Sequence, residues 1–226
     1  MKICGMTNLE DALVAVDAGA DAVGFVFYEK SPRCVSVQTA REIVGKLPEG
    51  VEKVGVFVGQ TTANLVATSN SVGLTAAQLY PDANGQLPTL DDEFFREAQC
   101  DVIVALSASV FQQAGRDPVG FFFSQRTLDR ILAILVDAGD GDRPGGTGTR
   151  FDWGQAPFLR EGMIRLGTRL IVAGGLSEAN AAQAVEAFRP WGVDVASGVE
   201  ARPGKKDPEK VRAFVRAVRE FDRKVS

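Results

Sequence analysis

The chain has 226 residues, of which 25 are Lys or Arg and 29 are Asp or Glu, giving a formal net charge of −4. This balance argues against an extended basic surface for nucleic acid or an anionic membrane, and the 45% hydrophobic content suits one domain with a full core. Histidine is absent, which excludes Ser-His triads and most catalytic zinc sites, because these depend on imidazole.

The cysteines indicate the compartment. Cys4, Cys34 and Cys100 form no CxxC pair and are odd in number, which favours free thiols in a reducing environment. Cys34 reads as a packing residue. No apolar run reaches the length of a membrane span, and the chain starts on a strand pattern rather than a signal peptide. The sequence therefore predicts a cytoplasmic protein.

Short apolar runs alternate with helical patterns from one end of the chain to the other. "KIC" reads as a strand and is followed by a helix with Asn8 at its N-cap; the strand at 20–27 precedes a helix that Ser36 caps. The further strand candidates are 52–58, 74–80, 101–108, 131–138, 170–175 and 191–197. The further helical windows are 62–69, 90–98, 178–188 and a last helix opened by Asp207 and Pro208.

Eight strand–helix units in this length predict a single (β/α)8 TIM barrel over residues 1–226. The strands are almost continuously apolar, as expected of parallel strands covered by helices. An open doubly wound sheet is the alternative, but "CGMTN" after the first strand lacks the GxGxxG fingerprint. Barrel chemistry lies where strands end and loops begin. The residues at those places are Cys4, Arg33, Gln78, Asp137, Gly174, Gly175, Asp194, Ser197 and Gly198.

Three segments are irregular. Residues 81–89 form a turn-rich loop, and residues 108–127 read either as an irregular fifth unit or as a pocket wall. The glycine-rich segment 139–153 has the composition of a lid over a site, and its position directly after Asp137 favours a lid over a plain linker.

Two loops indicate phosphate binding. "AGGL" follows the seventh strand and "ASGVE" the eighth, so Gly174, Gly175, Ser197 and Gly198 place small residues where backbone amides can approach an anion. Loop glycines are often only steric. Two such loops at neighbouring strand ends still favour a phosphate site.

Asp137 and Cys4 are the candidate acid and base. Asp137 ends an apolar strand, and to act as an acid near pH 7 the pKa of its carboxyl must rise by about 3, which burial and a nearby phosphate can supply. The ordinary reading of such an aspartate is a cap or turn acceptor. Cys4 is by residue type more often a small buried hydrophobe than a reactive thiol.

Arg33, Gln78 and Asp194 complete the predicted site as substrate-binding residues. Arg33 follows the second strand and could pair with a carboxylate or phosphate, although most loop arginines are simply exposed. Gln78 and Asp194 lie at the ends of the fourth and eighth strands.

Several segments in order along nearly the whole chain resemble one family. They are "KICGMTN", "GADAVGFVFYEKSPRCVS", "GVFV", "QLY", "LVDAG", "GGTGTRFDW", "AGGL" and "VDVASGVEARPGKKD". The family is phosphoribosylanthranilate isomerase of tryptophan biosynthesis.

The resemblance implies an Amadori rearrangement of N-(5-phosphoribosyl)anthranilate to the 1-deoxyribulose phosphate product. It implies that Cys4 is the general base, that Asp137 is the general acid, and that Arg33 holds the anthranilate carboxylate. It implies a small-molecule substrate, no cofactor and no metal, and leaves the oligomeric state open.

Two positions depart from the family pattern. Tyr80 stands where a histidine of a QLHG motif is usual, and "VIVALSA" lacks a lysine common in the fifth strand. Two alternatives stay open: a related sugar-phosphate Amadori isomerase of histidine biosynthesis, and a non-catalytic barrel that binds a phosphate ligand. The first is disfavoured because that family uses an aspartate where this chain has Cys4; the second needs neither Cys4 nor Asp137.

Overall fold

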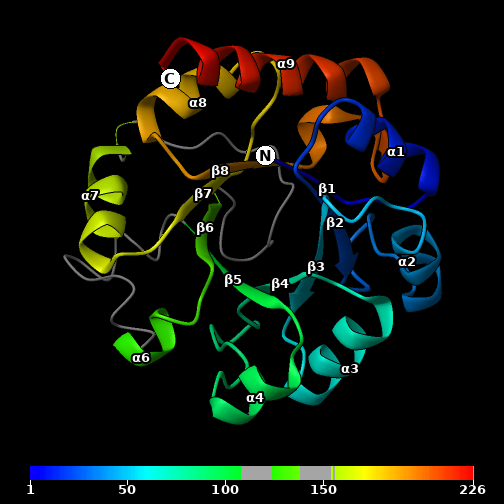
Figure 1. Ribbon diagram of the computed structural model, residues 1–226, viewed down its shortest axis with the longest axis vertical. Helices are drawn as coiled ribbons and strands as arrows, with labels where there is room; N and C mark the ends of the chain where they lie inside the picture. Colours follow the sequence, from blue (N-terminus) through cyan, green and yellow to red (C-terminus); the bar gives the residue numbers. More distant parts are fainter. Residues whose placement is uncertain (108–123, 138–153, 155, 226) are drawn as a thin grey trace.

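The computed structural model describes residues 1–107, 124–137, 154 and 156–225, and the side chains up to residue 221. Its centre is a closed barrel of parallel strands in sequential order, with β8 pairing back to β1 (Figure 1). The strands are β1 Lys2–Cys4, β2 Ala22–Phe27, β3 Glu52–Val58, β4 Ala76–Tyr80, β5 Asp101–Ser107, β6 Ala133–Asp137, β7 Leu170–Ala173 and β8 Gly192–Val195. The predicted TIM barrel is confirmed.

Helices surround the barrel on its outside (Figure 1). They are α1 Leu9–Asp17, α2 Val37–Val44, α3 Thr62–Val72, α4 Asp92–Glu97, α6 Gln125–Leu128, α7 Ala156–Leu166, α8 Ala181–Phe188 and α9 Pro208–Val225. The predicted caps are confirmed, because the side chains of Asn8 and Ser36 accept hydrogen bonds from backbone N–H groups three residues on. The carboxylate of Asp207 does the same at the start of α9.

Several predicted boundaries were wrong by a few residues. The helix expected at 178–188 begins only at Ala181, because Asn180 closes a turn first: its side chain accepts from the Ser177 amide and donates to the Gly175 carbonyl. Within the segment 108–127, residues 124–127 belong to α6 and its N-cap Ser124, whereas 108–123 lie outside the described residues. The proposed lid at 139–153 also lies outside them.

The buried side chains form two layers. One fills the space between the strands and the helices, where Phe25, Phe188 and Phe214 are fully buried. The other fills the barrel interior and includes Val54, Ile103 and apolar neighbours. Alternation along each strand produces the two layers, since successive side chains point to opposite faces.

The interpretation of Cys34 as a packing residue was wrong. Cys34 is exposed in the loop after β2, whereas its neighbours Arg33 and Val35 turn inward and are buried. Cys100 lies just before β5, at the end of the barrel opposite to the carboxyl ends of the strands, and is partly buried.

A short hairpin follows β8 and was not predicted. The 3-10 turn Ser197–Val199 leads into β9 Glu200–Arg202, which pairs with β10 Lys205–Lys206 before α9 begins. Its turn brings the Gly204 carbonyl to Thr7 of the loop after β1, which donates a hydrogen bond of 2.6 Å. Among the described helices, none is long and apolar enough to cross a membrane.

Candidate active site

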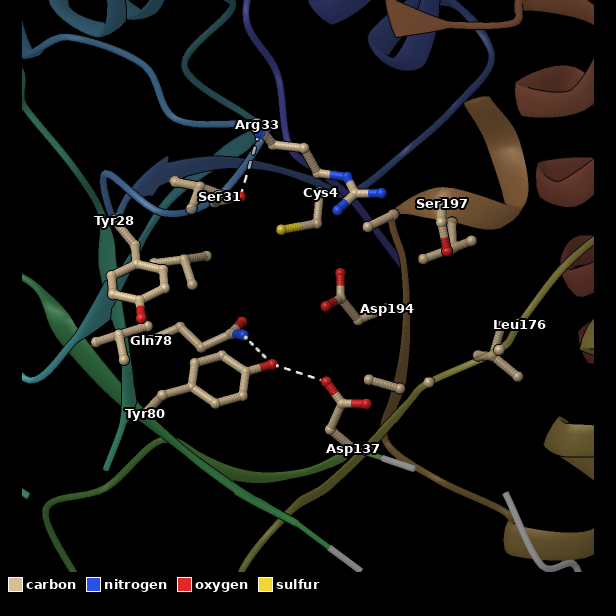
Figure 2. A pocket seen from close by; sticks show the side chains of 18 residues that line it. Cys4, Tyr28, Ser31, Arg33, Gln78, Tyr80, Asp137, Leu176, Asp194 and Ser197 are labelled. Carbon is tan, nitrogen blue, oxygen red and sulfur yellow. Dashed lines mark hydrogen bonds between the residues drawn. The ribbon is translucent and has the colours of Figure 1, made fainter. Parts of the chain in front are cut away.

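The carboxyl ends of the strands surround an open pocket (Figure 2). The empty space between its walls, counted out into the solvent at its mouth, is about 660 Å³. Every residue of the predicted site lines it except Gly198. The lining residues are Cys4, Val26, Tyr28, Ser31, Arg33, Val56, Val58, Gln78, Tyr80, Asp137, Ala173, Gly174, Gly175, Leu176, Asp194, Val195, Ala196 and Ser197.

Cys4 ends β1 and directs its thiol into the pocket, with 6% of the residue exposed. It pairs in register with Gly24 of β2. A Cβ added at Gly24 would lie 2.7 Å from the Cys4 sulfur, so the glycine makes the space that the thiol occupies. The sequence interpretation missed Gly24, because only the register of β1 against β2 shows what it faces.

Lys2 is the second residue that the sequence interpretation missed. It lies two positions before Cys4 on β1, so both side chains point into the barrel. Its ammonium donates hydrogen bonds of 2.9 Å to Asp194 Oδ1 and to Gln78 Oε1. A lysine in a buried three-residue strand is the one signal that could have indicated this role.

Charges on β1 and β8 act on one another. Burial raises the pKa of the Cys4 thiol, and the positive charge of Lys2 opposes that rise without cancelling it. Burial also disfavours charged Lys2, but the Asp194 carboxylate, with help from Cys4, more than offsets this and holds the pKa of Lys2 above its ordinary value. The thiol therefore sits beside a lysine that stays charged.

Asp137 ends β6 on the side of the pocket across from Cys4 (Figure 2). It is 4% exposed, and its Oδ2 accepts a hydrogen bond of 3.0 Å from the hydroxyl of Tyr80 on β4. Gln78 donates a longer hydrogen bond of 3.4 Å to the same hydroxyl. The position that departs from the family pattern thus contacts the predicted acid directly.

Arg33 is buried, not an exposed loop arginine. Its guanidinium donates from Nε and Nη2 to the two carboxylate oxygens of Glu200, at 2.8 Å each. Lys206 adds a second cation, 3.1 Å from Glu200 Oε1. Burial would raise the pKa of Glu200, but Arg33 and Lys206 together hold it below the ordinary value. This pairing with β9 fixes where the guanidinium lies.

The two glycine loops meet at the pocket rim. Gly174 and Gly175 both have positive φ, at 90° and 62°, which glycine adopts without strain. A Cβ at Gly198 would lie only 1.8 Å from the Leu176 carbonyl oxygen, so Gly198 lets the loop after β8 approach the loop after β7. Gly198 therefore packs the loops together, and Ser197 and the first two glycines face the pocket.

Within the described ranges, no group of three or more Cys, Asp or Glu side chains could hold a metal ion. The residues that the structure brings together are instead one thiol, one carboxyl on each of β6 and β8, a lysine and an arginine. Such a set can move protons and bind anions.

Comparisons with known proteins agree on one family. The family model for N-(5'-phosphoribosyl)anthranilate isomerase matches residues 1–217. An isomerase of that name from Rubrobacter xylanophilus is 43% identical over 97% of this chain and 98% of its own, and one from Pelobacter propionicus is 41% identical over 97% and 95%.

Solved structures agree with this. The phosphoribosyl anthranilate isomerases of Thermotoga maritima and Thermus thermophilus superpose with TM-scores of 0.74 and 0.75, at 36% and 33% identity, each covering 97% of this chain and 98% of the other. Another such isomerase, 35% identical with a TM-score of 0.71 and 97% of both chains covered, was solved in complex with reduced 1-(o-carboxyphenylamino)-1-deoxyribulose 5-phosphate. The chain therefore belongs to the N-(5'-phosphoribosyl)anthranilate isomerase family.

Proposed function

We propose that this protein converts N-(5-phosphoribosyl)anthranilate to 1-(2-carboxyphenylamino)-1-deoxyribulose 5-phosphate, a step of tryptophan biosynthesis. Membership of the family supports the reaction. The observation that carries the assignment of roles is that Cys4 and Asp137 line facing sides of one pocket (Figure 2). A base and an acid placed on two sides of one sugar can act on different atoms of it.

Asp137 acts first. Its carboxyl gives a proton to the ring oxygen of the ribose, the bond between that oxygen and C1 breaks, and the nitrogen lone pair forms a C=N bond. The product is an open-chain protonated Schiff base. Burial beside apolar strand residues favours a carboxyl that keeps a proton to give.

Cys4 then removes the proton from C2 of the sugar. The electrons of that C–H bond form a C1–C2 double bond, and those of the C=N bond return to nitrogen, giving an enol that tautomerises to the ketone. The base must be a thiolate, and Lys2 lies where its charge favours the thiolate. Because burial still raises the pKa of Cys4, the Cys4 limb of the pH–rate profile lies above neutral pH.

Arg33 and the glycine loops hold the two ends of the substrate. The bonds from Arg33 to Glu200 use Nε and Nη2, and Nη1 is the nitrogen we assign to the anthranilate carboxylate. The loops with Gly174, Gly175 and Ser197 bind the phosphate through backbone amides. Gln78 and Asp194 bind substrate less directly, because Lys2 already bonds to both.

We also place the protein in the cytoplasm. All three cysteines are free thiols, including the exposed Cys34. Free thiols are the state expected in a reducing compartment.

The test is the loss of anthranilate fluorescence as the purified protein turns over freshly made phosphoribosylanthranilate. Cys4→Ala and Asp137→Asn should each lower kcat by about 10²–10⁴-fold while remaining folded. Cys34→Ala is the matched control, because this exposed thiol lies outside the pocket lining. A folded wild-type protein that binds the substrate without turnover would make the chain a phosphate-ligand-binding barrel instead.

A further inference from the structure

Tyr80 is joined to the acid of the site by a hydrogen bond. It is the last residue of β4, with 9% of the residue exposed, and its ring lines the pocket beside Asp137 (Figure 2). A chain of hydrogen bonds runs from the Gln78 amide to the Tyr80 hydroxyl and from that hydroxyl to Asp137 Oδ2.

The direction of the second bond is settled by chemistry. Burial, and then the negative charges of Asp137, Asp194 and Cys4, raise the pKa of Tyr80 well above its ordinary value. The phenol therefore keeps its proton throughout the working pH range, and it is the donor toward the carboxylate. A hydrogen bond to an ionised oxygen is about twice as strong as one between neutral groups.

We propose that Tyr80 is a positioning residue for Asp137, which fixes the orientation of the carboxyl and stabilises the carboxylate left when its proton moves to the ribose ring oxygen. This inference rests on the proposed function. The bond strengthens as the O–H bond of Asp137 breaks and negative charge develops on its oxygens. Such a contact is tighter in the transition state than in the ground state, and therefore accelerates ring opening.

Asp137 has neighbours on several strands of the barrel. In the described strands, β5 and β7 set Ser107 and Ala173 beside it in register. The titratable or charged side chains of the barrel interior are Tyr80 on β4, Asp194 on β8, and Lys2 and Cys4 on β1. Tyr28 and Arg33, from the segment after β2, also line the pocket. Of all these side chains, Tyr80 donates a hydrogen bond of 3.0 Å to the Asp137 carboxylate.

The experiment measures kcat and the pH profile of kcat/KM for wild type and Tyr80→Phe, which keeps the ring and removes only the hydroxyl. We expect kcat to fall by about tenfold, as for loss of a hydrogen bond to a charged group. We also expect the limb of the profile that belongs to Asp137 to move to higher pH by about one unit. Without the hydrogen bond from Tyr80 the charged carboxylate is less stable, so Asp137 keeps its proton to higher pH. The limb that belongs to Cys4 should stay in place.

Two further variants complete the design. Compared with Tyr80→Phe, Tyr80→His should have a higher kcat and an Asp137 limb closer to its wild-type position, because an imidazole N–H can also donate to the Asp137 carboxylate. Tyr28→Phe removes the hydroxyl of the chain's other tyrosine, on another wall of the same pocket, and should leave both limbs in place.

The inference is overturned if Tyr80→Phe leaves both limbs unmoved, whether or not its rate falls, since a rate loss alone indicates a structural effect. Failure of the proposed function is distinct from this result, because wild type itself would then not turn over the substrate.

Discussion

The base and the acid of the proposed site are held by different means. On the base side, Cys4 sits beside Lys2, whose ammonium is paired with Asp194 inside the barrel, and a second buried ion pair joins Arg33 to Glu200 nearby. On the acid side, Asp137 is held from β4 by the hydroxyl of a tyrosine. Ion pairs therefore surround the base Cys4, whereas the neutral hydroxyl of Tyr80 contacts the acid Asp137.

This difference has an energetic consequence. A buried ion pair that loses one member leaves an unpaired charge in a poor solvent, which costs about 3–5 kcal/mol, whereas a tyrosine that loses its hydroxyl still fills its space. Changes on the base side should therefore reduce both stability and turnover. Changes on the acid side should reduce turnover with little effect on stability.

The largest expected effect comes from Lys2→Met. It leaves Asp194 buried without its cation and should lower the free energy of unfolding by about 3–5 kcal/mol. Because Lys2 opposes the rise in the pKa of Cys4, its loss should also move the Cys4 limb of the kcat/KM profile to higher pH. Urea unfolding and the pH profile measure the two effects.

Two controls accompany this variant. Lys53→Met removes another buried lysine, whose ammonium donates to the carbonyls of Pro48 and Glu49, and should leave the pH profile unmoved. Lys2→Met combined with Asp194→Leu removes both charges and should regain stability without regaining the rate. If the Cys4 limb of the kcat/KM profile did not move in Lys2→Met, the charge of Lys2 would not affect the pKa of the Cys4 thiol.

The second-largest effect is expected from Glu200→Gln. It removes the charge that pairs with Arg33 and Lys206, and should cost about 3 kcal/mol near pH 7. Because the pKa of Glu200 is lower in the folded than in the unfolded protein, its contribution is complete above about pH 4.3 and is lost as pH falls through the folded value.

Unfolding measured between pH 7 and acid pH checks this sign. Wild type should lose stability as pH falls below about 5, and the slope should be shallower in Glu200→Gln. A variant whose curve runs parallel to that of wild type would mean that Glu200 does not carry the acid sensitivity. KM should rise more than kcat falls, because Arg33 loses its fixed position.

Gly24→Ala should have a smaller effect on stability, about 1–3 kcal/mol from overpacking, and a selective effect on the base. The new methyl would meet the Cys4 sulfur at 2.7 Å and Lys2 Cε at 3.0 Å, so the thiol must move. Gly192→Ala on β8 is the matched control, since its methyl would meet Ile171 at an ordinary 3.6 Å. Equal loss of kcat in both variants would remove the steric argument.

The fold could be predicted because its signals are local. Continuous apolar strands, N-caps such as Asn8 and Ser36, and the Asp207–Pro208 helix start each lie within a few residues of what they specify. The predicted start of a helix was wrong where a side chain closes a turn before the helix begins, as that of Asn180 does before α8.

The candidate site was predicted in part, because its residues end strands, but their partners were not. Lys2 bonds to residues 76 and 192 positions away, and Arg33 to one 167 positions away. No window of sequence contains both members of such a pair. Gly24 was missed for the same reason, since its role depends on which residue of β1 stands opposite.

The smallest effect is expected away from the pocket, in exposed ion pairs of the outer helices. Asp92 at the start of α4 pairs with Arg126 and Arg130, but its side chain is 62% exposed and that of Arg126 77%. Water and salt screen such pairs, so Asp92→Ala should lower the free energy of unfolding by less than about 1 kcal/mol and leave kcat unchanged.

Urea unfolding of Asp92→Ala in low and high salt gives the check. The loss in the free energy of unfolding caused by Asp92→Ala should shrink in high salt. The loss caused by Lys2→Met should persist, because the Lys2–Asp194 pair is shielded from solvent ions. If both costs fell equally with salt, the Lys2–Asp194 pair would be open to solvent, and its burial could not explain why it contributes more than the exposed Asp92 pairs.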